Sequence, residues 1–153
     1  MCLIVDNNIV RRVLIVQNDP DFGEISRALF TGQPYPARLV YERRLRAEYE
    51  TNTEVSFQFL VLVRAQRAIL APDAPIQAEM DALQESGLCK SNDLHILALA
   101  RVTGVRLLCS LDQPLHTDFT NAALLSKPRG KVYQNASHSH LLRRACKPAD
   151  TPD

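Results

Sequence analysis

Four acidic residues, Asp6, Glu48, Asp93 and Asp112, stand where strands and helices would bring their carboxylates together. Asp6 and Asp112 follow apolar runs typical of strands, whereas Glu48 and Asp93 fall in segments with helical spacing. Two like charges about 4 Å apart repel by roughly 4 kcal/mol at an effective dielectric near 20. A cluster of these carboxylates therefore needs protons, hydrogen-bond donors or a divalent metal ion, and we expect a metal ion.

Each acid also has an ordinary structural explanation when it is considered alone. Asp93 suits the start of a helix, Asp112 suits a turn before Gln-Pro, Glu48 suits a solvated helix face, and Asp6 suits the end of a strand. Only the arrangement of all four together favours a shared site over four separate explanations.

Apolar runs and helical patterns alternate along the chain. The runs predict strands near residues 3–5, 37–41, 69–70, 105–109 and 131–133. Helical spacing predicts helices over 8–15, over 20–31 after a cap at Asp19, over 54–67 and 76–86, and over 93–103, where apolar residues almost all round indicate a central helix. It also predicts a helix that carries Leu45, Glu48 and Tyr49, and a short helix that the turn Asp112-Gln113-Pro114 opens and that contains Phe119. This alternation predicts an α/β fold, a three-layer α/β/α sandwich with a small, mainly parallel sheet. We expect one domain over residues 1–134, followed by a polar, partly helical or frayed C-terminal extension over 135–153.

The composition is that of a globular protein. The chain has 153 residues, of which 46% are hydrophobic and 23% charged, and no apolar run is long enough to span a bilayer. The short apolar stretch at the amino terminus lacks a preceding basic region, so it predicts a buried strand and not a secretory signal. We therefore expect a cytoplasmic protein with no membrane role.

The cysteines and the net charge exclude other classes. Cys2, Cys89, Cys109 and Cys146 form no Cys-x-x-Cys pair, which argues against structural zinc and predicts buried or incidental thiols. With 18 basic and 17 acidic residues, no global field attracts nucleic acid, so any phosphate binding must be local.

Four segments carry a resemblance to a known family: LIVDNN, LVYERRLRAEY, SNDLHILALARVTG and LLCSLDQPLHTDF, in this order and at these separations. Together they resemble the PIN-domain nucleases, which include the toxin ribonucleases of bacterial toxin–antitoxin pairs. The similarity covers residues 1–133. It implies a metal-dependent phosphodiesterase, usually acting on RNA, with an acidic pocket that holds one or two Mg²⁺ or Mn²⁺ ions.

The resemblance also assigns roles to individual residues. It places Asp6, Glu48, Asp93 and Asp112 as the catalytic acids, with the aspartates as metal ligands and Glu48 as a ligand or the residue that positions water. Supporting residues that would orient the site are Asn7, Asn92, Ser110 and the auxiliary acid Asp118. The second acid is open, because Glu42 and Glu50 lie close to Glu48 in the sequence. His95, two residues after Asp93, is expected to point away from it and to pack or to bond to a neighbouring side chain.

Basic residues flank the acids in the sequence. They are Arg43, Arg44 and Arg46 around Glu48, and Lys127, Arg129 and Lys131 after the last acid. They would contact the sugar-phosphate backbone of RNA, or they form a solvated surface or the face that meets an acidic partner.

The leading interpretation is an Mg²⁺- or Mn²⁺-dependent endoribonuclease, with RNA as substrate and an antitoxin-like protein as partner. The alternative is a catalytically inactive PIN-like module that binds RNA or protein. A receiver-like phosphatase is disfavoured, because no lysine stands clearly at a later strand end. Apolar helix faces around Phe57, Phe59 and Leu62 pack in the core or form a homodimer surface.

Overall fold

Five short strands form one sheet in which every neighbouring pair is parallel. In the computed structural model, which describes residues 1–143, they are β1 (Cys2–Val5), β2 (Arg38–Tyr41), β3 (Ala68–Leu70), β4 (Leu107–Cys109) and β5 (Lys131–Tyr133). Their order across the sheet is β3-β2-β1-β4-β5. The chain thus builds β1 to β3 in one direction and then crosses to the other side of β1 for β4 and β5.

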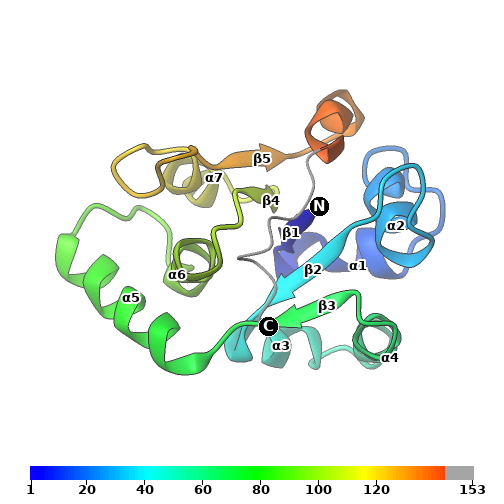
Figure 1. The fold of residues 1–153 in the computed structure, drawn as a ribbon, viewed down its shortest axis with the longest axis horizontal. Coiled ribbons are helices and arrows are strands. Elements are labelled where there is room, and N and C mark those ends of the chain that lie inside the picture. The colour runs from blue at the N-terminus through cyan, green and yellow to red at the C-terminus, as the bar shows by residue number, and fades with distance from the viewer. Residues whose placement is uncertain (144–153) are drawn as a thin grey trace.

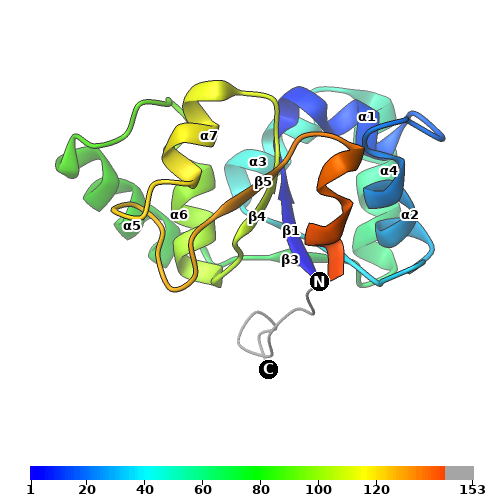
Figure 2. The same cartoon turned by 90° about the horizontal axis from the view of Figure 1, so that it is seen from above.

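Helices cover both faces of this sheet, which confirms the three-layer α/β/α sandwich. The helices are α1 (Val10–Leu14), α2 (Gly23–Phe30), α3 (Arg43–Tyr49), α4 (Thr53–Arg64), α5 (Asp73–Ser86), α6 (Leu94–Thr103) and α7 (Gln113–Phe119), with 3-10 helices η1 (Asn7–Ile9) and η2 (Ala136–Arg143). In Figures 1 and 2, α1, α2 and α4 lie on one side of the strands, and α5 and α6 lie on the other.

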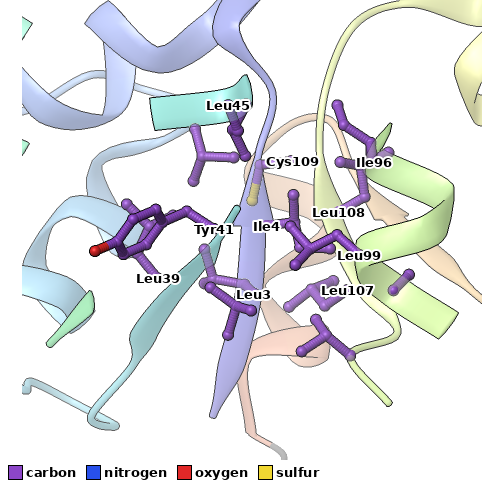
Figure 3. Packing of buried hydrophobic residues seen from close by; sticks show 14 of the residues in the cluster. Leu3, Ile4, Leu39, Tyr41, Leu45, Ile96, Leu99, Leu107, Leu108 and Cys109 are labelled. Atoms are coloured by element: carbon purple, nitrogen blue, oxygen red, sulfur yellow. The ribbon is translucent and has the colours of Figure 1, made fainter. Parts of the chain in front are cut away.

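The central strands are buried on both faces, as expected of a parallel sheet covered by helices. Leu3 and Ile4 of β1 are fully buried. Figure 3 shows Ile96 and Leu99 of α6 beside Leu108 of β4. Because α6 is apolar almost all round, it was predicted to be a central helix, and residues 95–100 are indeed all buried.

Glycines end two of these helices as their positions predict. Gly87 follows α5 with φ of 65°, and Gly104 follows α6 with φ of 77°. Glycine adopts this left-handed conformation without a Cβ clash. The end at Gly104 turns the chain directly from α6 into β4, which fixes the distance between Asp93 and the end of that strand.

The predicted start of the second helix is wrong by about one turn. Asp19 was expected to cap a helix beginning at Pro20, but α2 begins at Gly23. The Asp19 carboxylate instead accepts hydrogen bonds from the N–H groups of Asp21 and Phe22 and pairs with Arg12 at 2.9 Å. These bonds stabilise a turn ahead of the helix.

The predicted C-terminal extension begins with ordered structure. The helix η2 contacts β5 and α2, and its Leu142 is buried. The rest of the predicted extension, including Cys146, lies outside the described residues. Within residues 1–143, no helix is long and apolar enough to cross a membrane.

The expectation of free thiols holds at Cys89 and Cys109 and is wrong at Cys2. Cys89 and Cys109 are free, whereas Cys2 is disulfide-bonded.

Candidate acidic metal centre

Three aspartates from separate parts of the chain meet beyond the carboxyl ends of β1 and β4. One carboxylate oxygen from each of Asp6, Asp93 and Asp112 lies within 4.8 Å of the other two. Asp6 directly follows β1, Asp112 follows β4, and Asp93 immediately precedes α6. The strand order reverses direction between β1 and β4, and ligands of open α/β sheets bind at such switch points.

Ser110 links the two strand ends. Its hydroxyl donates a 2.7 Å hydrogen bond to Oδ2 of Asp6 and accepts one of 3.0 Å from the backbone N–H of Asp112. The backbone N–H of Asp6 also donates to the carbonyl of Cys109 at 2.9 Å. Ser110 therefore orients Asp6 and fixes the backbone at Asp112.

Asp112 has a second structural task at the start of α7. Its Oδ1 accepts a 3.2 Å hydrogen bond from the N–H of Leu115, so it caps this helix. A carboxylate has two oxygens, and the cap uses one of them. Asp112 therefore caps a helix, as its ordinary structural explanation requires, and also lies close to Asp6 and Asp93.

Asp118 holds the loop that delivers Asp93. Its carboxylate is almost fully buried and accepts hydrogen bonds from the N–H groups of Lys90, at 2.9 and 3.0 Å, and Ser91, at 2.8 Å. The hydroxyl of Ser91 in turn accepts a 3.3 Å bond from the N–H of Asp93. Asp118 was predicted to be an auxiliary acid, and the structure places it in this loop-holding network and not among the clustered carboxylates.

Glu48 lies beside the three aspartates on α3. Burial, followed in importance by the charges of Asp93, Asp6 and Glu42, raises its pKa to about 7, although the charge of Arg44 opposes this shift. Its Oε1 is 3.0 Å from Nε2 of His95. The predicted second acid is therefore close enough to the aspartates to feel their charge.

The two competing candidates for the second acid have other roles. Glu42 is buried at the start of α3, where its carboxylate accepts hydrogen bonds of 2.8 and 2.6 Å from the N–H groups of Arg44 and Leu45. Glu50 is exposed and pairs with Arg46 at 2.7 Å. Glu42 is a helix cap and Glu50 a surface residue, which leaves Glu48 as the acid that faces the cluster.

The cluster carries electrostatic strain. Burial raises the pKa of Asp6, and the nearby charge of Asp112 adds to this, although the Ser110 hydroxyl and the N–H groups of Asn7 and Asn8 lower it. Burial, Asp6 and Asp112 raise the pKa of Asp93. These groups therefore hold protons more tightly than free carboxylates do, which is the expected property of an acidic site that lacks enough positive charge.

His95 is buried against this cluster without hydrogen-bond partners. Its side chain is 3% exposed, and neither ring nitrogen forms a hydrogen bond, because the close approach to Glu48 is not aligned as one. Burial and the charge of Arg44 lower its pKa to about 4. Buried polar atoms in proteins usually have hydrogen-bond partners, so an ordered water or a ligand would complete the bonding of this imidazole.

The remaining predicted residues lie around the site with weaker links. Within residues 1–143, the side chains of Asn7 and Asn92 have no hydrogen bond to the acids. Nη1 of Arg43 is 3.8 Å from Oδ2 of Asp73, and Arg46 pairs with Glu50, so both arginines have acidic neighbours on the surface. Lys127, Arg129 and Lys131 are exposed near β5, and Arg129 donates to the carbonyl of Thr120.

Among the six predicted basic residues, Arg44 is the one whose charge affects Glu48 beside the cluster. It is exposed, lowers the pKa of Glu48 and Glu42, and lowers that of His95. Of the six predicted basic residues, it has the strongest claim to contact an anion at this site.

Two residues that support the site were not predicted. The hydroxyl of Tyr49, which is fully buried, donates to the carbonyl of Val5 and so ties α3 to the end of β1. Nε2 of His116 lies 2.6 Å from the carbonyl oxygen of Ser110. Their positions on amphipathic helices indicate burial, but nothing in the sequence identifies the distant carbonyl that each one contacts.

The donor set fits a hard divalent cation. Carboxylate oxygens are the ligands that Mg²⁺ and Mn²⁺ prefer, and Mg²⁺ is commonly held by a few carboxylates and several waters. Three aspartates within 4.8 Å of one another provide such a set, with Glu48 beside them. A cation would also offset the repulsion that raises the pKa of Asp6, Asp93 and Glu48.

Comparison with known proteins found no relative of this chain. No protein-family model, no curated protein and no solved structure matches the chain.

Proposed function

We propose that the protein is a divalent-metal-dependent phosphodiesterase that cleaves RNA. The observation that carries this proposal is the convergence of Asp6, Asp93 and Asp112 within 4.8 Å, at the switch point of a parallel sheet. The order of the four sequence segments that resemble PIN-domain nucleases supports the choice of a nuclease among metal-dependent enzymes.

The roles of the residues follow from their contacts. Asp6, Asp93 and Asp112 would hold Mg²⁺ or Mn²⁺, which supplies Lewis acidity and lowers the pKa of bound water. Glu48, with a pKa of about 7, is suited to hold a water molecule or to accept its proton near neutral pH. Ser110 keeps Asp6 oriented, and Asp118 keeps the loop before Asp93 in place.

Arg44 supports the assignment of a phosphodiester as substrate. Its exposed guanidinium lies close enough to Glu48 to affect its pKa, and guanidinium groups bind phosphate in a bidentate manner. Such contacts position nucleic acid without reading its sequence. A role as the toxin of a toxin–antitoxin pair, with an antitoxin-like protein as partner, rests on the sequence resemblance alone, as does a cytoplasmic location.

The test is metal-dependent cleavage by the purified full-length protein. Single-stranded and structured RNA are incubated with Mg²⁺, Mn²⁺ or EDTA, and wild type is compared with Asp6→Asn. The matched control is Asp81→Asn, on α5, where the carboxylate accepts a bond from the exposed Gln77 and is not part of the cluster.

We expect cleavage by wild type and Asp81→Asn with either metal, and none with EDTA or with Asp6→Asn. Wild-type protein that binds Mn²⁺ without cutting any RNA would favour the inactive binding module. Equal cleavage by wild type and Asp6→Asn would refute the proposed site.

A further inference from the structure

Helix α4 has apolar residues on two opposite faces, and one of these faces is exposed. Val55, Phe59 and Leu62 are buried in the core. Phe57, Leu60 and Val61 are 64%, 39% and 40% exposed. The structure thus divides the apolar residues of this helix: Phe59 and Leu62 belong to the core, and Phe57 lies on the surface.

The exposed residues share one face because they are three and four positions apart. We call Phe57, Leu60 and Val61 the α4 patch. The helix lies at the opposite end of the molecule from α5 (Figures 1 and 2). Val16, two residues after α1, is 43% exposed and lines, with Gln58 of α4, a groove of about 380 Å³.

Two charged residues bracket the α4 patch in a symmetric arrangement. Glu54 precedes Phe57 by three residues, and Arg64 follows Val61 by three residues. Glu54, Phe57, Val61 and Arg64 are therefore three, four and three positions apart along the helix. When two copies of the helix run antiparallel, this spacing places Glu54 opposite Arg64 of the second copy and Phe57 opposite Val61. A parallel pair would instead set like charges against each other.

Both charged side chains are available for such a contact. Glu54 has only a loose pair with Arg11, at 3.9 Å, in which the two side chains are 66% and 52% exposed. Arg64 is exposed and has no ion pair within the described part of the chain. Exposed pairs of this kind contribute little within the protomer, so they do not oppose a contact between copies.

We propose that the α4 patch binds the same patch of a second copy of this chain, through an antiparallel, two-fold symmetric pairing of α4. An isologous interface requires a surface that is complementary to itself, and the ordered charges around the patch satisfy that requirement. The apolar residues supply the buried area, and the charge pairs fix the direction of the helices. This inference does not depend on the proposed nuclease activity.

The first test measures the mass of the full-length protein by sedimentation equilibrium. Wild type forms a dimer, Phe57→Glu is monomeric, and the control Leu88→Glu stays dimeric, since Leu88 is 52% exposed but follows α5. Circular dichroism verifies that each variant is folded. A wild type that is monomeric at about 100 μM, a concentration at which specific dimers of micromolar affinity are fully formed, overturns the proposal. A dimer that Phe57→Glu leaves intact also overturns it.

The second test reverses the charges. Arg64→Glu alone sets two acids against each other at both ends of the pair and weakens dimerisation at least tenfold. Combining it with Glu54→Arg restores the dissociation constant to within about threefold of wild type, because both pairs are rebuilt in the opposite sense. A double variant as weak as Arg64→Glu overturns the antiparallel arrangement, even if Phe57 proves essential.

Discussion

At the scale of single residues, the site is a set of carboxylates whose charges are only partly balanced. Asp93 illustrates this, because burial and the charges of Asp6 and Asp112 raise its pKa. Its side chain makes no capping hydrogen bond at the start of α6, so it stabilises this helix through the helix dipole alone. A side chain that costs free energy without a structural bond is typical of a functional site.

Replacing Asp93 by Asn should separate function from stability. We expect Asp93→Asn to lose metal binding and RNA cleavage, while the metal-free variant melts at the same temperature as wild type or a few degrees higher, because repulsion is relieved. Isothermal titration with Mn²⁺ and thermal melting in EDTA measure the two effects. A variant that binds Mn²⁺ as wild type does would contradict the role of Asp93.

Glu48 should make the stability of the metal-free protein depend on pH. Its pKa is raised from 4.5 to about 7 in the folded protein, so its stabilising contribution is complete below pH 4.5 and is lost as the pH rises through 7. Glu48→Gln removes this loss. The variant should therefore match wild type near pH 5 and be more stable near pH 8, by about 1–2 kcal/mol once the partial exposure of the side chain is considered.

Wild type must be compared with Glu48→Gln, because the titration of His95 changes the free energy of unfolding with pH in the opposite direction. Its pKa is lowered from 6.5 to about 4, so its contribution is lost as the pH falls between these values. In wild type alone, the contributions of Glu48 and His95 to the pH dependence of the free energy of unfolding would partly cancel. Urea unfolding of both proteins in EDTA at several pH values isolates Glu48, and a constant difference between them would contradict its raised pKa.

At the scale of elements, the site depends on how neighbouring segments are tied together. Ser110 joins the ends of β1 and β4, Tyr49 ties α3 to β1, and Asp118 ties α7 to the loop before α6. Each tie crosses between segments that are distant in sequence. The geometry of the acidic cluster is therefore a property of these connections as much as of the acids.

Removing the Asp118 carboxylate should loosen the loop that carries Asp93. Asp118→Ala leaves the N–H groups of Lys90 and Ser91 without their acceptor, and we expect a loss of about 2 kcal/mol or more in the free energy of unfolding. Cleavage should fall as well, although the clustered aspartates remain. Urea unfolding followed by circular dichroism measures the loss. Asp81→Ala on the exposed face of α5 serves as the control, and an equal effect in both variants would contradict the role of Asp118.

The sequence predicts elements better than it predicts the contacts between them. The strands were predicted because short apolar runs such as Leu3 to Val5 are bounded by polar residues, and the helix ends at Gly87 and Gly104 because glycine tolerates positive φ. The choice between Glu42, Glu48 and Glu50 could not be made from sequence. It depends on which carboxylate caps α3, which faces solvent and which faces the aspartates, and these are properties of the packed helix.

The same limit applies to Asp118 and to α4. The sequence places Asp118 six residues beyond Asp112, but only the packing of α7 against the loop reveals the N–H groups that donate hydrogen bonds to its carboxylate. In α4, apolar residues occur on two opposite faces, and only the packed structure shows that the face with Phe59 is buried and the face with Phe57 is exposed.

At the scale of the whole molecule, the sheet order gives the acids a common location. Since β1 and β4 are adjacent and parallel, their carboxyl ends lie at one edge, and the reversal of strand order leaves that edge open to a ligand. Segments as distant as Asp6 and Asp112 are thereby brought within 4.8 Å of each other. The stability of the entire fold should consequently respond to a cation bound there.

Mn²⁺ should raise the melting temperature of the protein, and more strongly at pH 8 than at pH 6. A ligand at 100 times its dissociation constant stabilises the folded state by about 2.7 kcal/mol, which corresponds to roughly 5–10 °C for a domain of this size. The effect grows with pH because protons compete with the cation at Glu48, whose pKa is about 7, and EDTA should reverse it. Asp112→Asn should lose most of the shift, whereas Asp81→Asn should retain it. Equal shifts in these two variants would mean that the cation binds elsewhere, and the open edge between β1 and β4 would then need another explanation.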